Sequence, residues 1–268
     1  MNIERVTWDN FKDKIGVHVK SGEGPMICRG QANSTWSLVT RFHRGPNGLT
    51  LQEFSSFMPE LADMIGTLER REIEINTPDR LGSFIAYLQH HGFPTPILDF
   101  SSSPYIAAFF AFCDLQALTS EYASVYIFDF LKWRAHWKET FEIGATNPHV
   151  TVLKPKSLGN SRQLNQQGYY LFTNLHDVEA HIVAHEGLRK EIYLKKYELS
   201  SNERNYVLAD LDSMGINYYS LFGTTDSFCA YLRDGIFQRT TNGKNAVQLI
   251  RELQLKHQNS NSASQSTS

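Results

Sequence analysis

The sequence predicts an α+β protein, a single domain in which helices flank a mixed or antiparallel sheet. Short apolar runs of strand length alternate along the chain with segments of helical period. The composition, 41% hydrophobic, 12% aromatic and 20% charged, is that of an ordinary globular protein. No internal repeat or long linker interrupts the chain before its end. We therefore expect one domain over residues 1–240, followed over residues 241–268 by the remnant of a helix and a disordered tail rich in Ser, Asn and Gln.

The first third of the chain predicts one strand and two helices. Residues 25–29 form a short apolar run that ends in Arg-Gly, which predicts a strand that enters a turn. Apolar residues recur at helical spacing over residues 51–71, and Pro59 among them predicts a boundary or a kink. A second helix should begin at Thr77-Pro78, because proline suits the first helical position. It should end near Gly92, since Phe-Pro follows.

The middle of the chain predicts a strand, a turn and a buried helix. Residues 95–100 are apolar and β-compatible, and the next four are Ser-Ser-Ser-Pro, where a serine can cap a helix and Pro104 can begin it. Residues 105–112 are apolar on nearly every side, so we expect this helix to be buried. Further strands are expected at residues 123–130, 169–173 and 191–197, and further helices at about residues 201–214 and 225–232.

Charge, cysteine usage and hydropathy narrow the class of protein. The formal net charge of −2 gives no reason to expect tight nucleic-acid binding, although a local basic groove would still allow a nucleic-acid substrate. Cys28, Cys113 and Cys229 are widely spaced, so we expect buried thiols rather than a disulfide or a metal site. No apolar run approaches the ~18 residues that span a bilayer, and the N-terminus lacks the apolar core of a signal peptide. We therefore expect a cytoplasmic protein with no metal cofactor.

Residues 28–31 are Cys-Arg-Gly-Gln, and this segment resembles the Phe-Arg-Gly signature that names the FRG domain, with Cys28 in place of Phe. Residues 89–100 resemble the family's central motif, Gln-His-aromatic-Gly-apolar-Pro-Thr-Arg-Leu-Leu-Asp-aromatic, with His91 and Pro96 as the two departures. The other elements that resemble the family are Trp36, Arg41, Ser103-Pro104, Ala107, Phe110-Ala111, Arg162, Gln167-Gly168-Tyr169 and Leu221-Phe222 with Asp226. The resemblance covers roughly residues 20–235 and implies that the chain is an FRG-domain protein.

A weaker resemblance connects the same chain to the arginine-type ADP-ribosyltransferases. These enzymes begin with a strand that ends in aromatic-Arg-Gly, continue with a strand into Ser-Thr-Ser and a helix, and finish with Glu-x-Glu before an apolar run. Here residues 28–30 are Cys-Arg-Gly, residues 100–103 are Phe-Ser-Ser-Ser, and residues 190–194 are Lys-Glu-Ile-Tyr-Leu. Arg189 stands where a Glu or Gln normally determines transferase activity. The resemblance implies an ADP-ribosyltransferase-like split sheet.

This resemblance also implies a role for individual residues in the cleavage of NAD. Arg29 would hold the diphosphate with its planar fork of N–H groups, and Gly30 would let the backbone approach the ligand. Glu191 would stabilise the cationic ribose of the transition state. Ser101 or Ser102 would orient a carboxylate or hold the ribose, and an aromatic ring such as Phe100 or Tyr105 would stack on the nicotinamide. The residues implied in catalysis are Glu191, Ser101 and His90, and those implied in nucleotide binding are Arg29, Gly30, Gln31, Arg41, Thr95, Asp99, Ser102, Tyr105, Arg162 and Gln167.

Two classes of function remain open. The first is an NAD-consuming enzyme that transfers ADP-ribose to a protein or a nucleic acid, or to water, and it is compatible with the role of a toxin or a phage-defence effector. The second is a non-catalytic module that uses the same pocket to bind a nucleotide or a protein, and Arg189 motivates it.

Each residue also has a purely structural interpretation. Arg29 would pair with Asp99 and tie two strands together, since an acid inside an apolar strand needs a partner. The serines at residues 101–103 would cap a helix whatever the chemistry. Glu191 would be a solvated charge at the edge of a strand. His90 and its neighbour project to different faces, which disfavours a shared metal ion.

Overall fold

The computed structural model describes residues 1–22, 24–45, 49–139, 141–154, 161–241, 244–252 and 254–255. The chain forms two compact units, Met1–Val207 and Leu208–Ser268. The expected domain boundary at residue 240 stays a prediction, and the tail expected to be disordered, residues 258–268, lies outside the described residues. None of the described helices is both long and apolar enough to cross a lipid bilayer.

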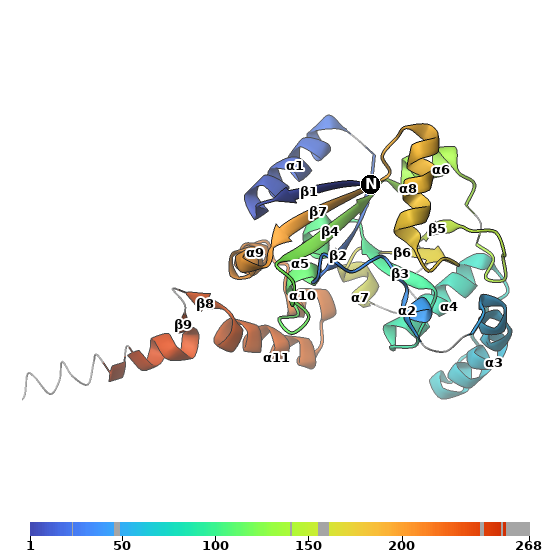
Figure 1. The fold of residues 1–268 in the computed structure, drawn as a ribbon. Coiled ribbons are helices and arrows are strands. Elements are labelled where there is room, and N and C mark those ends of the chain that lie inside the picture. Colours follow the sequence, from blue (N-terminus) through green and yellow to red (C-terminus); the bar gives the residue numbers. More distant parts are fainter. Residues whose placement is uncertain are drawn as a thin grey trace, which may run out of the picture. The chain divides into compact units, whose positions relative to one another are not determined.

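A seven-stranded mixed sheet forms the centre of the first unit (Figure 1). In sheet order the strands are β1 (Asn2–Val6), β7 (Leu194–Ser200), β4 (Tyr122–Phe128), β2 (Ile27–Gln31), β3 (Ile97–Ser101), β6 (Gly168–Thr173) and β5 (Val150–Leu153). β1 runs parallel to β7, and the other neighbours in this sheet are antiparallel. The predicted α+β class with a mixed sheet is confirmed.

Pairing almost stops between β2 and β3. β2 pairs with β4 along its whole length, from Ile27 to Gln31, but it pairs with β3 only at Cys28 and Ser101. The strands therefore fall into two groups, β1-β7-β4-β2 and β3-β6-β5, which one residue pair joins. Because antiparallel neighbours normally exchange hydrogen bonds along their length, the strands must diverge beyond that pair.

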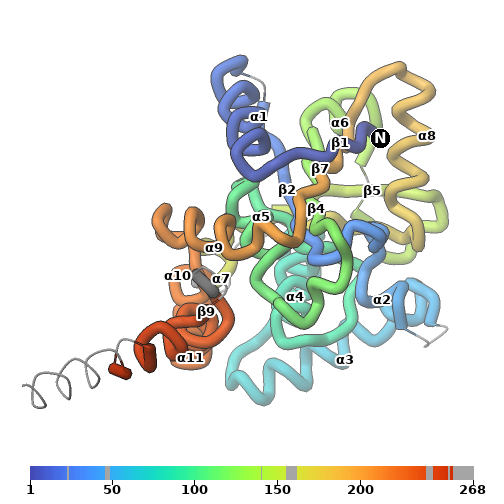
Figure 2. The backbone as a smooth tube through the Cα atoms, turned by 60° about the vertical axis from the view of Figure 1, so that its left-hand side comes forward, coloured from blue at the N-terminus to red at the C-terminus, as the bar shows by residue number. Residues whose placement is uncertain are grey.

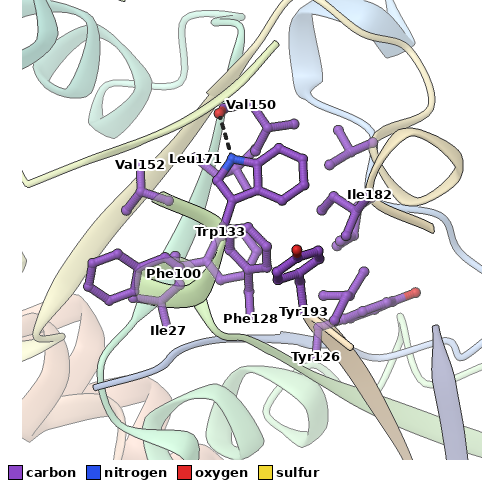
Figure 3. Packing of buried hydrophobic residues seen from close by; sticks show 14 of the residues in the cluster. Ile27, Phe100, Tyr126, Phe128, Trp133, Val150, Val152, Leu171, Ile182 and Tyr193 are labelled. Atoms are coloured by element: carbon purple, nitrogen blue, oxygen red, sulfur yellow. Dashed lines mark hydrogen bonds between the residues drawn. The ribbon is translucent and has the colours of Figure 1, made fainter. Parts of the chain in front are cut away.

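Helices cover both faces of this sheet. Their bounds are α1 (Trp8–Ser21), α2 (Arg41–Arg44), α3 (Leu51–Glu69), α4 (Pro78–His90), α5 (Pro104–Phe112), α6 (Phe130–His136), α7 (Ser161–Asn165) and α8 (Val178–Arg189). On one face, α6 and α8 enclose a core around Trp133, whose indole N–H donates to the carbonyl of Val150 at 3.2 Å (Figure 3). On the other face α5 packs on β2 and β4, while α4, with α3 beside it (Figures 1 and 2), packs on Ile97 and Phe172.

Two helix starts follow the predicted chemistry. Thr77 caps α4 and Pro78 occupies its first turn, and Ser103 and Pro104 do the same for α5. The hydroxyl of Ser103 accepts a hydrogen bond from the amide of Ile106 at 3.3 Å. Both signals are local, which explains why the sequence alone predicts them.

Two boundary predictions are wrong. The boundary expected at Pro59 is wrong, because α3 continues through the proline, while the alternative of a kink stays a prediction. A capping box at Thr50 fixes the start of α3, and apolar residues on both sides of Pro59 are buried. β7 begins at Leu194 rather than at residue 191, so Glu191 lies in the loop before the strand. The preceding helix α8 ends at Arg189 with Lys190 in a left-handed conformation, which delays the start of the strand.

The second unit contains most of α9 (Arg204–Ser213) and then α10 (Tyr218–Phe222), α11 (Thr225–Arg233), a five-residue π-helix (Asp234–Gln238) and the short strands β8 (Thr240–Thr241) and β9 (Lys244–Asn245). Arg239 holds the unit together, since its guanidinium contacts Asp234 at 2.6 Å and Asp212 at 3.0 Å. The predicted helices near residues 201–214 and 225–232 are confirmed.

Candidate functional site

A cavity of about 330 Å³ opens where β2 and β3 diverge, and we call it the main cavity. Its lining comes from β2, β3, β6, α4, α5 and α7, and comprises Cys28, Arg29, Gly30, Ala86, Gln89, His90, Asp99, Phe100, Ser101, Ala107, Phe110, Arg162, Gln163, Gln166 and Tyr170. A smaller cavity of about 140 Å³, the arginine cavity, is lined by Arg29, Arg41, Arg44, Gln89, Phe93, Ile97, Leu98 and Asp99. Arg29, Gln89 and Asp99 line both cavities, so the two adjoin.

Arg29 bridges the gap between the strands. Its Nη1 donates to the main-chain carbonyl of Asp99 at 2.7 Å, so a side chain continues the link where the main-chain ladder stops. No carboxylate of the described residues forms an ion pair with Arg29, and its buried Nε has no hydrogen-bond partner among them. The expected ion pair with the Asp99 carboxylate is therefore not formed. A half-buried guanidinium with unused donors is typical of a binding site.

The electrostatics of Arg29 agree with this interpretation. Burial lowers the pKa of Arg29, and the neighbouring Arg44 lowers this pKa further, whereas Asp99 raises it. The ordinary pKa of arginine lies so far above neutrality that the side chain stays charged. A buried charge without an ionic partner is unfavourable, and an anionic ligand would offset that penalty.

The carboxylate of Asp99 is held by a chain of hydrogen bonds. The amide of Gln89 donates to its Oδ2 at 2.8 Å, and the fully buried hydroxyl of Thr95 donates to the carbonyl oxygen of Gln89. Gln89, Thr95 and Asp99 are all positions of the central motif at residues 89–100. Their shared network gives that motif a physical purpose, because it fixes a carboxylate that remains exposed to both cavities.

The serine turn after β3 is occupied by structural hydrogen bonds. Ser101 is buried, donates to the carbonyl of Gln166 at 2.8 Å and accepts from the amide of Ser103 at 3.0 Å. The hydroxyl of Ser102 donates to the side-chain carbonyl of Gln167 at 3.0 Å. Gln167 has a left-handed backbone, φ 50°, that turns the chain from α7 into β6. The serines therefore hold the α7 turn against β3, which builds one wall of the main cavity.

Gly30 is required by packing rather than by a ligand. A Cβ at this position would collide with the carbonyl oxygen of Ala107 and lie 2.7 Å from the amide nitrogen of Ala111. The absence of a side chain thus lets α5 approach β2. The next residue, Gln31, is buried outside both cavities and donates to the carbonyl of Ser37 at 3.3 Å.

Glu191 and Tyr105 lie outside both cavities. Glu191 has its carboxylate 3.8 Å from Nδ1 of His136, in the loop before β7. The ring of Tyr105 packs edge-on against Trp8 of α1, with centroids 6.1 Å apart. Thr95, Ser102 and Gln167 support the cavity walls without lining them. The predicted residues that the cavities do collect are Arg29, Gly30, Arg41, His90, Asp99, Ser101 and Arg162.

The remaining titratable groups set the charge of the main cavity. Burial and then Arg162 lower the pKa of His90, which favours the neutral imidazole at pH 7. Burial lowers the pKa of Arg162 while Asp99 raises it, and burial followed by Asp99 raises the pKa of Tyr170. The lining thus combines two arginines, one carboxylate and a neutral phenol and imidazole. Among the described residues no group of three or more His, Cys, Asp or Glu side chains is arranged to hold a metal ion.

Several lining residues were not predicted. Arg44 stands three positions after Arg41, a spacing that puts both on one side of α2 and that could have found it. Gln89 stands in the quoted central motif without an assigned role. Phe110 belongs to the family resemblance without an assigned role, and Tyr170 carries no signal beyond an apolar strand pattern. Only the tertiary fold brings α5 and β6 to the same cavity.

Comparison with known proteins supports the first of the two resemblances. Residues 24–119 match the FRG domain, so the chain contains an FRG domain that extends from before β2 to beyond α5. This segment supplies Arg29, Arg41, Gln89 and Asp99, whereas Arg162 comes from outside it. A search of curated proteins and a search of solved structures gave no significant match. None of the comparisons supports the resemblance to ADP-ribosyltransferases, which stays a prediction.

Proposed function

We propose that this FRG-domain protein binds a nucleotide in the two adjoining cavities, with NAD as the first candidate. The observation that carries the proposal is the state of Arg29, which lines both cavities, bonds only to a main-chain carbonyl among the described residues, and keeps a buried Nε without a partner. Guanidinium groups bind phosphates through paired charge-assisted hydrogen bonds.

The arginine cavity suits phosphate groups. Three arginines and a single carboxylate line it, so its charge favours an anion. The main cavity suits a ring and its ribose, because Phe110, Tyr170 and Phe100 stand beside the amides of Gln163 and Gln166. A ligand whose phosphates contact Arg29 and whose ring enters the main cavity would use both.

A series of ligands tests this arrangement. We expect the melting temperature to rise with NAD, ADP-ribose and ADP, and to rise little with adenosine, because binding to the native state alone stabilises it. Arg29→Gln should abolish the rise. Arg5→Gln is the matched control, because Arg5 is an exposed arginine on β1 that pairs with Glu198 and lines neither cavity. Equal shifts with adenosine and ADP, or an unchanged shift in Arg29→Gln, would contradict the proposal.

The finer proposal is that the bound NAD is cleaved, by ADP-ribosyl transfer or by hydrolysis. The bond between nicotinamide and ribose breaks, nicotinamide leaves with the electron pair, and an acceptor hydroxyl or water attacks the cationic ribose and loses its proton. Asp99 is the carboxylate that supports this step, because it is exposed in both cavities and Gln89 fixes it. Glu191 lies outside them.

Nicotinamide release separates the enzyme from the binding module. We expect wild type and Glu191→Gln to release nicotinamide at similar rates. Asp99→Asn should release it about 100-fold more slowly or slower still, because the loss of a group that stabilises charge in the transition state has an effect of that size. Nucleotide-dependent stabilisation without release by wild type would favour the non-catalytic module. The roles of toxin and phage-defence effector depend on cleavage and stand or fall with this assay.

A further inference from the structure

Helix α3 carries an apolar stripe beside the face that packs on the core. Phe57, Leu61, Met64 and Leu68 follow one another at spacings of four, three and four residues, so they lie along one helical face. Phe57 is 48%, Met64 62% and Leu68 75% exposed. The neighbouring face, which includes Phe54 and Met58, is buried, and Leu61 lies at the border, where it packs partly against the core. The apolar surface of the helix therefore continues from the buried face onto side chains that are exposed.

The stripe borders a groove of about 390 Å³. Phe93 and Pro94, in the turn after α4, form its other wall, and Phe57 and Met64 line the α3 side. Apart from Glu60 the lining residues are apolar. An exposed apolar groove beside an amphipathic helix is the form in which proteins bind a partner helix.

The α3 side of the groove is acidic. Glu60 lines the groove and Asp63 precedes Met64, and both carboxylates are exposed. No basic side chain of the described residues pairs with either of them, and α3 itself contains no Lys, Arg or His. Two copies of α3 would bring like charges together, and an anionic lipid surface would be repelled. The complementary occupant is a helix with basic flanks.

We propose that the groove binds an amphipathic helix of a partner protein, whose apolar side chains fill the groove and whose Lys or Arg residues face Glu60 and Asp63. This inference is independent of the nucleotide site. The two sites nevertheless share one side chain, since Phe93 also lines the arginine cavity. A partner helix in the groove would therefore pack against a wall of the nucleotide site.

Two synthetic helical peptides test the charge requirement. Both carry the same leucine seam, one with lysine and the other with glutamate at the flanking positions, and binding to the full chain is followed by fluorescence anisotropy. We expect the lysine peptide to bind at least about tenfold more tightly, and added salt to shrink the difference. Equal affinities, or no binding by either peptide, would overturn the proposal.

Surface variants locate the binding. Met64→Ser and Leu68→Ser remove exposed side chains, so the fold should persist while affinity for the lysine peptide falls about tenfold. Val19→Ser, at a residue of α1 that is 69% exposed, is the matched control and should change nothing. Glu60→Gln should lower the affinity for the lysine peptide but not the affinity for the glutamate peptide. Binding of the lysine peptide that survives both Leu68→Ser and Met64→Ser would refute the assignment. A dimer of this chain that Leu68→Ser dissociates would refute it too, because a second copy of the chain would then occupy the groove.

Discussion

The two edges of β2 differ in how completely they pair with the neighbouring strand. Toward β4 the strand pairs along its whole length, and α5 approaches so closely that Gly30 cannot carry a side chain. Toward β3 a single pair forms, and the side chain of Arg29 spans the gap beside two cavities. One strand thus supplies both rigidity and an open site. Consecutive residues of the Arg-Gly signature serve these two purposes, the arginine on the open edge and the glycine against α5.

The largest expected effect falls on the closed edge. Gly30→Ala should destabilise the protein by about 3 kcal/mol, because a backbone carbonyl and a backbone amide occupy the space that the methyl group needs. Gly187→Ala is the control, since a Cβ at this helical position meets nothing within 4 Å. It should raise the free energy of unfolding by about 1 kcal/mol, because alanine favours the helix more than glycine does. Denaturant unfolding measures both. A neutral Gly30→Ala would show that β2 and α5 can separate, and the contrast between the edges would be lost.

A smaller effect is expected at the support of the open edge. Thr95→Val keeps the shape of the side chain but removes the hydroxyl that donates to Gln89, so it should cost about 1–2 kcal/mol and loosen the hold on Asp99. Thr67→Val, on the exposed side of α3, is the control and should change the free energy of unfolding by no more than about 0.5 kcal/mol. If Thr95→Val changed neither stability nor nucleotide binding, the network would have no part in positioning Asp99.

The cap of α5 should contribute less. Ser103→Ala removes the hydroxyl that accepts from the amide of Ile106, which should cost about 1 kcal/mol in denaturant unfolding. Ser102→Ala, whose hydroxyl bonds only to the side chain of Gln167 among the described residues, is the comparison and should cost less. The reverse order would place the important serine bond at the α7 turn instead of the helix start.

A pH dependence of stability is expected from a group outside the site. Burial, with help from His185 and His149, lowers the pKa of His181 from 6.5 to about 4. The unfolded chain therefore binds more protons between these values, so stability should fall as the pH drops from about 6.5 to about 4 and should change no further through this group below that range. His181→Gln should flatten the slope of unfolding free energy against pH. An unchanged slope would show that other groups cause the pH dependence of stability.

Local signals predicted part of this molecule well. The caps at Thr77 and Ser103 and the alternation of strands and helices depend on neighbouring residues, so the sequence reveals them. An acid inside an apolar strand needs a partner, and this argument indicated Arg29 as the partner of Asp99. Their bond, however, runs to a main-chain oxygen, and no residue pattern distinguishes that from an ion pair.

The site could be predicted less completely than the fold. Glu191 followed from an ordered series of motifs and Tyr105 from its aromatic ring after the serine turn, but order along the chain does not decide which loops meet in space. The loop that holds Glu191 packs near His136, and Tyr105 faces Trp8. Conversely, Arg44 and Tyr170 enter the cavities only because α2 and β6 approach β3 in the folded chain.

The most direct test of the open edge is a calorimetric titration of the full chain with ADP-ribose, a ligand that carries the diphosphate and the ribose but has no nicotinamide bond to break. We predict that wild type and Arg5→Gln bind with equal affinity and that Arg29→Gln, titrated at a temperature at which all three proteins are folded, loses at least about tenfold in affinity. Equal affinity in Arg29→Gln and wild type would contradict it and would leave Arg29 as a purely structural link between β2 and β3.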